Sequence, residues 1–250
     1  MANVQAVVVG MFLLLLGAFQ SGPAPSAQAR PATPLDPTAA IIEAFKQHPV
    51  VCLGGAHGDR LGEAFQLALI QDPRLPAAVQ DIVLETGNSR YQPLVDRFVN
   101  GETVEQAALE QVWLDTTQQQ AAARKIPEAL AVIRRLNSSR PPQQRLRVLV
   151  GEPPIEWERM KTADDLQTWE QQPQSDRDRV GADLVRREIL AKKRRALLLY
   201  GAGHCFRKPR TQSIVTLLEA GNDKTFNIWT NVAFECPAHS LMSTRGRDRA

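Results

Sequence analysis

The sequence is poor in several features that define large classes of proteins. It has three cysteines in 250 residues and 6% aromatic residues, so it lacks the disulfide scaffold that many small secreted domains use. The formal net charge is only +3, and the basic residues are not interleaved with aromatic ones. The sequence therefore gives no indication of a nucleic-acid-binding surface.

The N-terminal segment has the pattern of an export signal. Residues 6–19 form an uncharged apolar run, which is shorter than the ~20 residues that a membrane-spanning helix needs. Ala27-Gln28-Ala29 then supplies the small-x-small pattern of a signal-peptidase site, although residues 1–5 contain no lysine or arginine. We expect a signal peptide at residues 1–29 and an exported mature protein, periplasmic or secreted, with no permanent membrane anchor.

The remainder of the sequence predicts a single α/β domain. Residues 30–38 have the composition of a linker, residues 39–237 are expected to form the domain, and residues 238–250 a flexible polar tail. Amphipathic helical patterns alternate with short apolar segments, and this alternation predicts a mainly parallel sheet flanked by helices on both faces. Five segments have the length and composition of buried strands: residues 50–53, 82–84, 146–150, 196–200 and 226–230.

Several helices have recognisable starting residues. A capping side chain or a proline stands at the beginning of six segments, at Asp59, Thr103, Pro127, Thr162, Asp176 and Thr211. Apolar residues at helical spacing follow each of them, so these positions predict where the helices begin.

Side chains with useful chemistry are concentrated where the predicted strands end. His57 and His204 each follow a buried strand in a Gly-x-x-His pattern, and Glu85 follows another strand. Because the carboxyl ends of parallel strands meet at one edge of a sheet, we expect these three side chains to share a site. Two imidazoles and one carboxylate can hold a divalent metal ion with a position open for water, or can activate water without a metal. Glu152, at the end of a fourth strand, is a candidate for a further acid in the same site.

Purely structural roles compete with these chemical ones. Glu85 could cap the next helix or pair with Arg90 or Arg97, and Gly-Glu-Pro-Pro around Glu152 also fits an ordinary turn. The other two histidines lie away from the strand ends and are expected at the surface: His48 and His239.

The three cysteines leave their pairing open. In an exported chain, Cys52, Cys205 and Cys236 can form one disulfide and leave one thiol, and the sequence does not select the pair. Cys52 lies in an apolar strand and also fits the role of a small buried hydrophobic residue.

The two Gly-x-x-His motifs resemble those of a known superfamily. They read Gly54-Gly55-Ala56-His57-Gly58 and Gly201-Ala202-Gly203-His204, and the intervening strand ends in an acidic residue in Asp81-Ile82-Val83-Leu84-Glu85. The combination is similar to the Tiki, TraB and erythromycin-esterase superfamily, which includes the ChaN-like haem-binding proteins. Three further segments resemble poorly characterised exported bacterial members of that group: residues 91–97, 112–117 and 151–157.

The resemblance implies more than one activity, since the superfamily includes metal-dependent peptidases, ester hydrolases and haem binders. Our leading hypothesis is a hydrolase that cleaves an ester or peptide bond in a small-molecule or peptide substrate, with His57, Glu85 and His204 holding a metal or activating water. The alternative is a haem-binding protein in which Tyr200 or a histidine ligates the iron, or a member that binds a ligand without chemistry. Gly55 stands where the esterase-like motif G-E-x-x-H has a glutamate, and this departure favours the binding protein.

Overall fold

A computed structural model describes residues 34–56, 58–117, 119–207 and 212–230 of the chain. The elements below all belong to the unit that begins at Leu35. The predicted signal peptide and polar tail, together with His57 and His239, lie outside the described residues. Within the described part of the chain, no helix is both long enough and apolar enough to cross a membrane.

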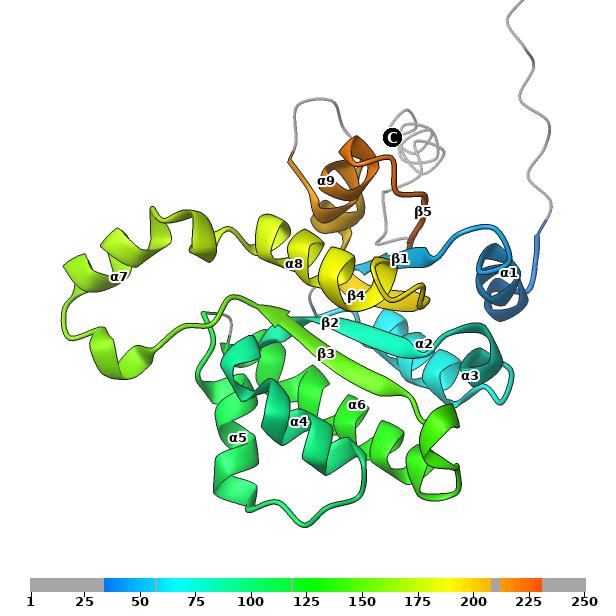
Figure 1. The fold of residues 1–250 in the computed structure, drawn as a ribbon, viewed down its shortest axis with the longest axis horizontal. Helices are drawn as coiled ribbons and strands as arrows, with labels where there is room; N and C mark the ends of the chain where they lie inside the picture. The colour runs from blue at the N-terminus through cyan, green and yellow to red at the C-terminus, as the bar shows by residue number, and fades with distance from the viewer. Residues whose placement is uncertain (1–33, 57, 118, 208–211, 231–250) are drawn as a thin grey trace, which may run out of the picture. The chain divides into compact units, whose positions relative to one another are not determined.

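Five parallel strands form one sheet in the order β3-β2-β4-β1-β5 (Figure 1). They are β1 (Val50–Gly55), β2 (Asp81–Asn88), β3 (Arg147–Glu152), β4 (Ala196–Gly201) and β5 (Thr225–Trp229). All five predicted strands and the α/β fold class are confirmed. β1, β2 and β4 are buried along their whole length, as expected for parallel strands with helices on both faces.

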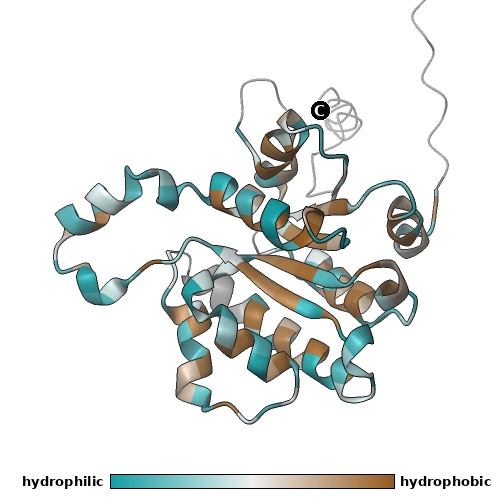
Figure 2. Cartoon of the chain, viewed as in Figure 1, coloured by the Kyte–Doolittle hydropathy of each residue, from teal (hydrophilic) through white to brown (hydrophobic). Residues whose placement is uncertain are grey.

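Helices cover both faces of the sheet. Side chains alternate along β1, so that Val51 and Leu53 join the core on one face while Val50 and Cys52 join the core on the other. In Figure 1, α4, α5 and α6 lie on one side of the sheet and α8 on the other. Figure 2 shows largely apolar strands between these helices, which carry both hydrophilic and apolar residues.

The helices are α1 (Pro37–Ala44), α2 (Arg60–Gln71), α3 (Leu75–Ala78), α4 (Gln92–Val99), α5 (Gln106–Leu114), α6 (Gln119–Ser138), α7 (Ala163–Glu170), α8 (Arg177–Val185) and α9 (Ile214–Ala220). A single π-helical turn, Arg186–Leu190, extends α8. Short 3₁₀ turns are η1 (Ser89–Tyr91), η2 (Pro142–Gln144), η3 (Trp157–Arg159), η4 (Pro173–Ser175) and η6 (Ala202–Cys205).

Three of the predicted helix starts are confirmed by their capping bonds. The side chains of Asp59, Thr162 and Asp176 accept hydrogen bonds from the first turns of α2, α7 and α8. At α9 the cap is Ser213, and Thr211 lies outside the described residues. The shared device is a short polar side chain that satisfies an otherwise unpaired backbone N–H.

The other predicted boundaries differ from the structure. α1 begins at Pro37, inside the predicted linker, because Asp36 caps it. α5 begins at Gln106, not at Thr103. α6 runs through Pro127, because a proline removes only one helical hydrogen bond and the buried side chains on either side, Ile126 and Leu130, hold the helix against the core.

The pairing of β2 with β3 is irregular near the end of β2, where Glu85 lies. β2 pairs regularly with β3 as far as Leu84, and the pairing resumes only at Asn88. Gly87, within this interval, has a φ of 103°, and a Cβ on it would lie 2.7 Å from a methyl carbon of Val150. Only glycine fits this conformation and this close approach. Glu85 lies in this irregular stretch of β2, close to the edge of the sheet where the parallel strands end.

Candidate functional site

The structure places three of the four predicted site residues at one edge of the sheet. Glu152 is the last residue of β3, Glu85 lies within β2 just after its regular pairing ends at Leu84, and His204 lies in η6, directly after β4. These strands are neighbours in the sheet. The fourth residue, His57, lies outside the described residues, so its place in the site stays a prediction.

The turn that carries His204 is tied to the sheet by a disulfide bond. Cys205 at the end of η6 is bonded to Cys52 in the middle of β1, with 5.9 Å between their Cα atoms. Both residues are fully buried. Cys52 is therefore buried as predicted, but it is a disulfide partner and not a free thiol, and the pairing that the sequence left open is settled in favour of Cys52 and Cys205.

Backbone packing reinforces this tie. A Cβ on Gly54 would lie 2.9 Å from the Cα of Ala202 and 3.3 Å from the Cβ of Cys205. The close approach of β1 to η6 thus depends on the absence of a side chain at Gly54. Together with the disulfide, it fixes the position from which the imidazole of His204 projects.

Glu85 is a buried carboxylate with three partners. One oxygen, Oε1, lies 3.3 Å from Nε2 of His204 and 3.0 Å from a terminal nitrogen of Arg177, and the other accepts a hydrogen bond from the backbone N–H of Gly201. Burial alone would raise the pKa of Glu85, but these partners outweigh it, the hydrogen bond from His204 most of all, and lower the pKa to about 2. Glu85 is therefore ionised at neutral pH.

His204 lies between two carboxylates. Its Nδ1 is 2.8 Å from Asp178 Oδ1, which also accepts a hydrogen bond of 2.7 Å from the backbone N–H of Ile214. Burial opposes the charged imidazolium, but the hydrogen bonds to Asp178 and Glu85 prevail and raise the pKa of His204 to about 9. At neutral pH both ring nitrogens carry protons, so His204 is poised to donate a proton and not to accept one.

Arg177 joins Glu85 to Glu152. The same terminal nitrogen that contacts Glu85 lies 3.2 Å from an oxygen of Glu152, whose side chain is fully buried. The second oxygen of Glu152 accepts hydrogen bonds from the backbone N–H and the hydroxyl of Thr117. Glu152 therefore forms an ion pair with Arg177 in the site. A purely structural role in a turn does not explain this ion pair.

Tyr200, the predicted iron ligand, is the penultimate residue of β4, and its side chain faces into the core. Its side chain is 3% exposed, and its hydroxyl has no hydrogen-bond partner among the described residues. A Cβ on Gly181 would lie 3.0 Å from that hydroxyl, so the phenol lies directly against the backbone of α8. Burial, with a further contribution from Glu85, raises the pKa of Tyr200 far above its ordinary value.

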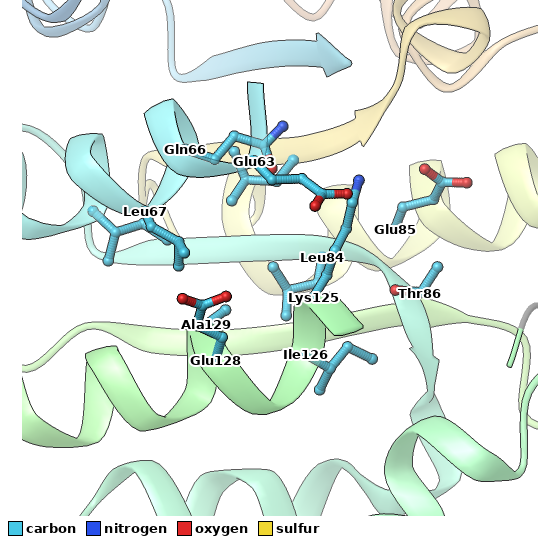
Figure 3. A pocket seen from close by; sticks show the side chains of 12 residues that line it. Glu63, Gln66, Leu67, Leu84, Glu85, Thr86, Lys125, Ile126, Glu128 and Ala129 are labelled. Atoms are coloured by element: carbon cyan, nitrogen blue, oxygen red, sulfur yellow. The ribbon is translucent and has the colours of Figure 1, made fainter. Parts of the chain in front are cut away.

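A pocket adjoins the charged cluster on the side of α2 and α6 (Figure 3). Its cavity volume is about 40 Å³, within a hollow of about 600 Å³ that includes open solvent. Glu85 belongs both to its lining and to the charged cluster. Most of the other lining side chains are apolar: Leu67, Ile70, Leu84, Ile126, Ala129 and Leu199.

Two site residues were missed by the sequence analysis, Arg177 and Asp178. They follow the correctly predicted cap Asp176, but nothing in the local sequence relates them to Glu85, which is 92 positions away from Arg177. The proposed pairing of Glu85 with nearby arginines is wrong: Arg90 pairs with Glu158, and Arg97 with Glu102.

The fold and the site together define an α/β protein with a charged cluster at the carboxyl ends of its parallel strands. No protein-family model matches the sequence, and no curated protein matches it either. Among solved structures, the chain is similar to ChaN of Campylobacter jejuni, in a structure titled for cofacial haem binding, with a TM-score of 0.48 and 15% identity over 81% of this chain and 88% of that chain. The observed sheet and helices, rather than this likeness, define the fold class, and the relationship to the Tiki and erythromycin-esterase superfamily stays a prediction.

Proposed function

We propose that this protein is a hydrolase of ester or peptide bonds in which His204 is the proton donor. The observation that carries the proposal is the position of His204 between Glu85 and Asp178, next to a pocket that Glu85 also lines. Ionisable groups whose protonation is shifted by burial and by specific partners, beside an apolar pocket with few polar groups, are typical of active sites.

Each group has a defined part in this proposal. The Nε2–H of His204 points at Glu85, so a leaving oxygen or nitrogen placed beside that carboxylate would receive the proton. Asp178 fixes the orientation of the ring through Nδ1, and Arg177 keeps Glu85 ionised and in place. The base that accepts a proton from water is His57, a role that comes from the sequence alone.

The described residues do not fit the two cofactors that the sequence suggested. No group of three His, Cys, Asp or Glu side chains in the described part of the chain is arranged to hold a metal ion. Both nitrogens of His204 are engaged by carboxylates and the hydroxyl of Tyr200 is buried, so either side chain would have to leave these contacts to ligate haem iron. The proposed chemistry uses the side chains of the chain.

Hydrolysis assays with matched histidine variants test the proposal. Purified mature protein would be assayed with a series of 4-nitrophenyl esters and with fluorogenic peptides. His204→Gln should lower kcat/KM by about 100-fold or more, which is the usual effect of losing a general acid, whereas His48→Gln should not. Activity of the His204→Gln variant equal to that of the wild type would refute the assignment.

The pH profile and a haem titration separate this proposal from its alternative. If His204 is the acid, kcat/KM falls as the pH rises through about 9, and this limb is absent in His204→Gln. A haem-binding protein would instead show a shifted Soret band on titration with haem, and the shift would be lost in Tyr200→Phe or His204→Gln. A wild-type protein that binds haem in this way and hydrolyses neither class of substrate would reverse the order of the two hypotheses.

A further inference from the structure

One amide in the pocket lining has no hydrogen-bond partner among the described residues. Gln66 on α2 is 7% exposed, and among the described residues its side-chain amide makes no hydrogen bond. Its Nε2 lies at the end of β1, 3.3 Å from where a Cβ on Gly55 would be. Because this amide lines the pocket, water satisfies it in the free protein, and a ligand that displaces the water must supply a hydrogen bond in its place.

A second neutral polar group has the same character. Thr86, also in the lining, is 5% exposed, and its hydroxyl has no hydrogen-bond partner in the described part of the chain. The remaining polar side chains of the lining differ from these two. Glu85 is held by Arg177 and His204, the ends of Glu63 and Lys125 point toward one another (Figure 3), and Glu128 is a charged group.

The pocket therefore combines apolar walls with two neutral groups that need hydrogen-bond partners. A ligand with an aliphatic part would contact the leucine and isoleucine side chains, and a neutral carbonyl or hydroxyl would satisfy Gln66 or Thr86. A ligand carboxylate would meet three acidic side chains in the lining, Glu63, Glu85 and Glu128, against one basic side chain, Lys125, and would be repelled. Specificity follows from the orphaned amide, since a ligand without a hydrogen-bonding group would leave it unpaired.

We infer that this pocket binds neutral aliphatic molecules bearing a carbonyl or hydroxyl group, with Gln66 as the residue that orients that group. The inference rests on the proposed function in one respect: if the protein is a hydrolase, the group that occupies this pocket is the apolar acyl or alkyl part of its substrate. The substrate class is then a neutral aliphatic ester or amide, and an anionic group at this position is disfavoured.

Binding of a ketone tests this inference separately from catalysis, because a ketone has no bond to hydrolyse. 2-Octanone and octanoate would be compared by ligand-observed NMR on the full mature chain. We expect 2-octanone to bind and octanoate to bind at least 10-fold more weakly. Absence of 2-octanone binding, or equal binding of octanoate, would overturn the inference.

Matched variants on α2 identify the residue. Gln66→Met keeps the volume and removes the amide, and it should weaken 2-octanone binding by about 10-fold, equivalent to one hydrogen bond. Gln71→Met is the control, because Gln71 lies on the same helix, is exposed and bonds only to the backbone of Leu67. Leu67→Phe, which narrows the pocket, should weaken the binding of 2-octanone without removing the amide.

The melting temperature of Gln66→Met distinguishes a loss of ligand binding from a loss of folding. Because the amide makes no hydrogen bond to the described residues, the variant should melt at the wild-type temperature or above it. A lower melting temperature with unchanged ketone binding would show that Gln66 is structural and would overturn the inference. Hydrolysis of esters without ketone binding would reject this inference and leave the proposed function standing, whereas ketone binding without any hydrolysis would do the reverse.

Discussion

At the scale of single residues, His204 and Glu85 couple the stability of the fold to pH. The pKa of His204 is raised to about 9, so its contribution is complete below its ordinary value of 6.5 and is lost as the pH rises through about 9. The pKa of Glu85 is lowered to about 2, so its contribution is complete above 4.5 and is lost as the pH falls through about 2. Because the two share one ion pair, their contributions are not independent.

The alkaline side of this dependence gives a prediction. Between pH 6.5 and 9 the wild type should lose on the order of 2–3 kcal/mol of unfolding free energy, measured by urea denaturation at a series of pH values. His204→Gln should be less stable at pH 6 and should show little change over the same interval. His48→Gln is the control and should keep the wild-type slope. A slope that survives in His204→Gln would assign the titration to another group.

Arg177 provides a second prediction at this scale. Arg177→Met would leave Glu85 and Glu152 buried without their shared cation, which should cost about 3–5 kcal/mol in unfolding free energy. Adding Glu152→Gln to that variant should restore part of the loss, because one uncompensated charge is removed. Arg179→Met, at an exposed position on the same helix, should cost less than about 0.5 kcal/mol. A loss below about 1 kcal/mol in Arg177→Met would show that the two carboxylates do not depend on this arginine.

The sequence predicted some of these residues and not others for a physical reason. Glu85 and His204 follow buried apolar strands, and parallel strands end at one edge, so local patterns sufficed to bring them together. Arg177 and Asp178 reach the site only because α8 crosses the sheet there, and no local pattern encodes that crossing. Gln66 is equally hidden, because on α2 it has the spacing of a core position and only the contacts show that its amide is unpaired.

At the scale of elements, the disulfide between β1 and η6 controls where His204 lies. It links residues 153 positions apart, and closing so long a loop restricts the unfolded chain strongly. The Cys52→Ala, Cys205→Ala double variant should therefore lose about 2–5 kcal/mol of unfolding free energy.

The same variant should change the site as well as the stability. Without the bond, η6 is held at β1 by packing alone, and the imidazole should spend less time beside Glu85 and Asp178. NMR titration of His204 should then give a pKa closer to the ordinary value than in the wild type. An unchanged His204 pKa in a destabilised variant would mean that packing at Gly54 is sufficient to position the turn.

Elements were easier to predict than their ends. The strands were recognisable because apolar segments of this length, buried on both faces, have few alternatives in an alternating chain. The ends of α2, α7 and α8 followed from capping side chains, which act locally. The start of α6 could not be predicted in this way. Burial of its apolar face outweighs the local preference of Pro127 for the first turn of a helix.

At the scale of the whole molecule, the predicted leader and the observed disulfide concern the same question, the compartment in which the chain folds. Disulfides persist in oxidising compartments and are rare where thiols are kept reduced. A bond between two fully buried cysteines therefore agrees with the export that we expect from residues 1–29.

Expression with and without this leader gives the corresponding prediction. With the leader, in a bacterial host, the recovered protein should begin at Arg30, and its intact mass should correspond to one disulfide. Without the leader, produced in a reducing cytoplasm, the same chain should carry free thiols at Cys52 and Cys205 and should melt at a lower temperature, recovering on oxidation. N-terminal sequencing, thiol titration and thermal unfolding measure these outcomes. A protein that starts at Met1 in the exported fraction would contradict the cleavage site, and equal melting temperatures of the oxidised and reduced chains would contradict a stabilising role of the disulfide.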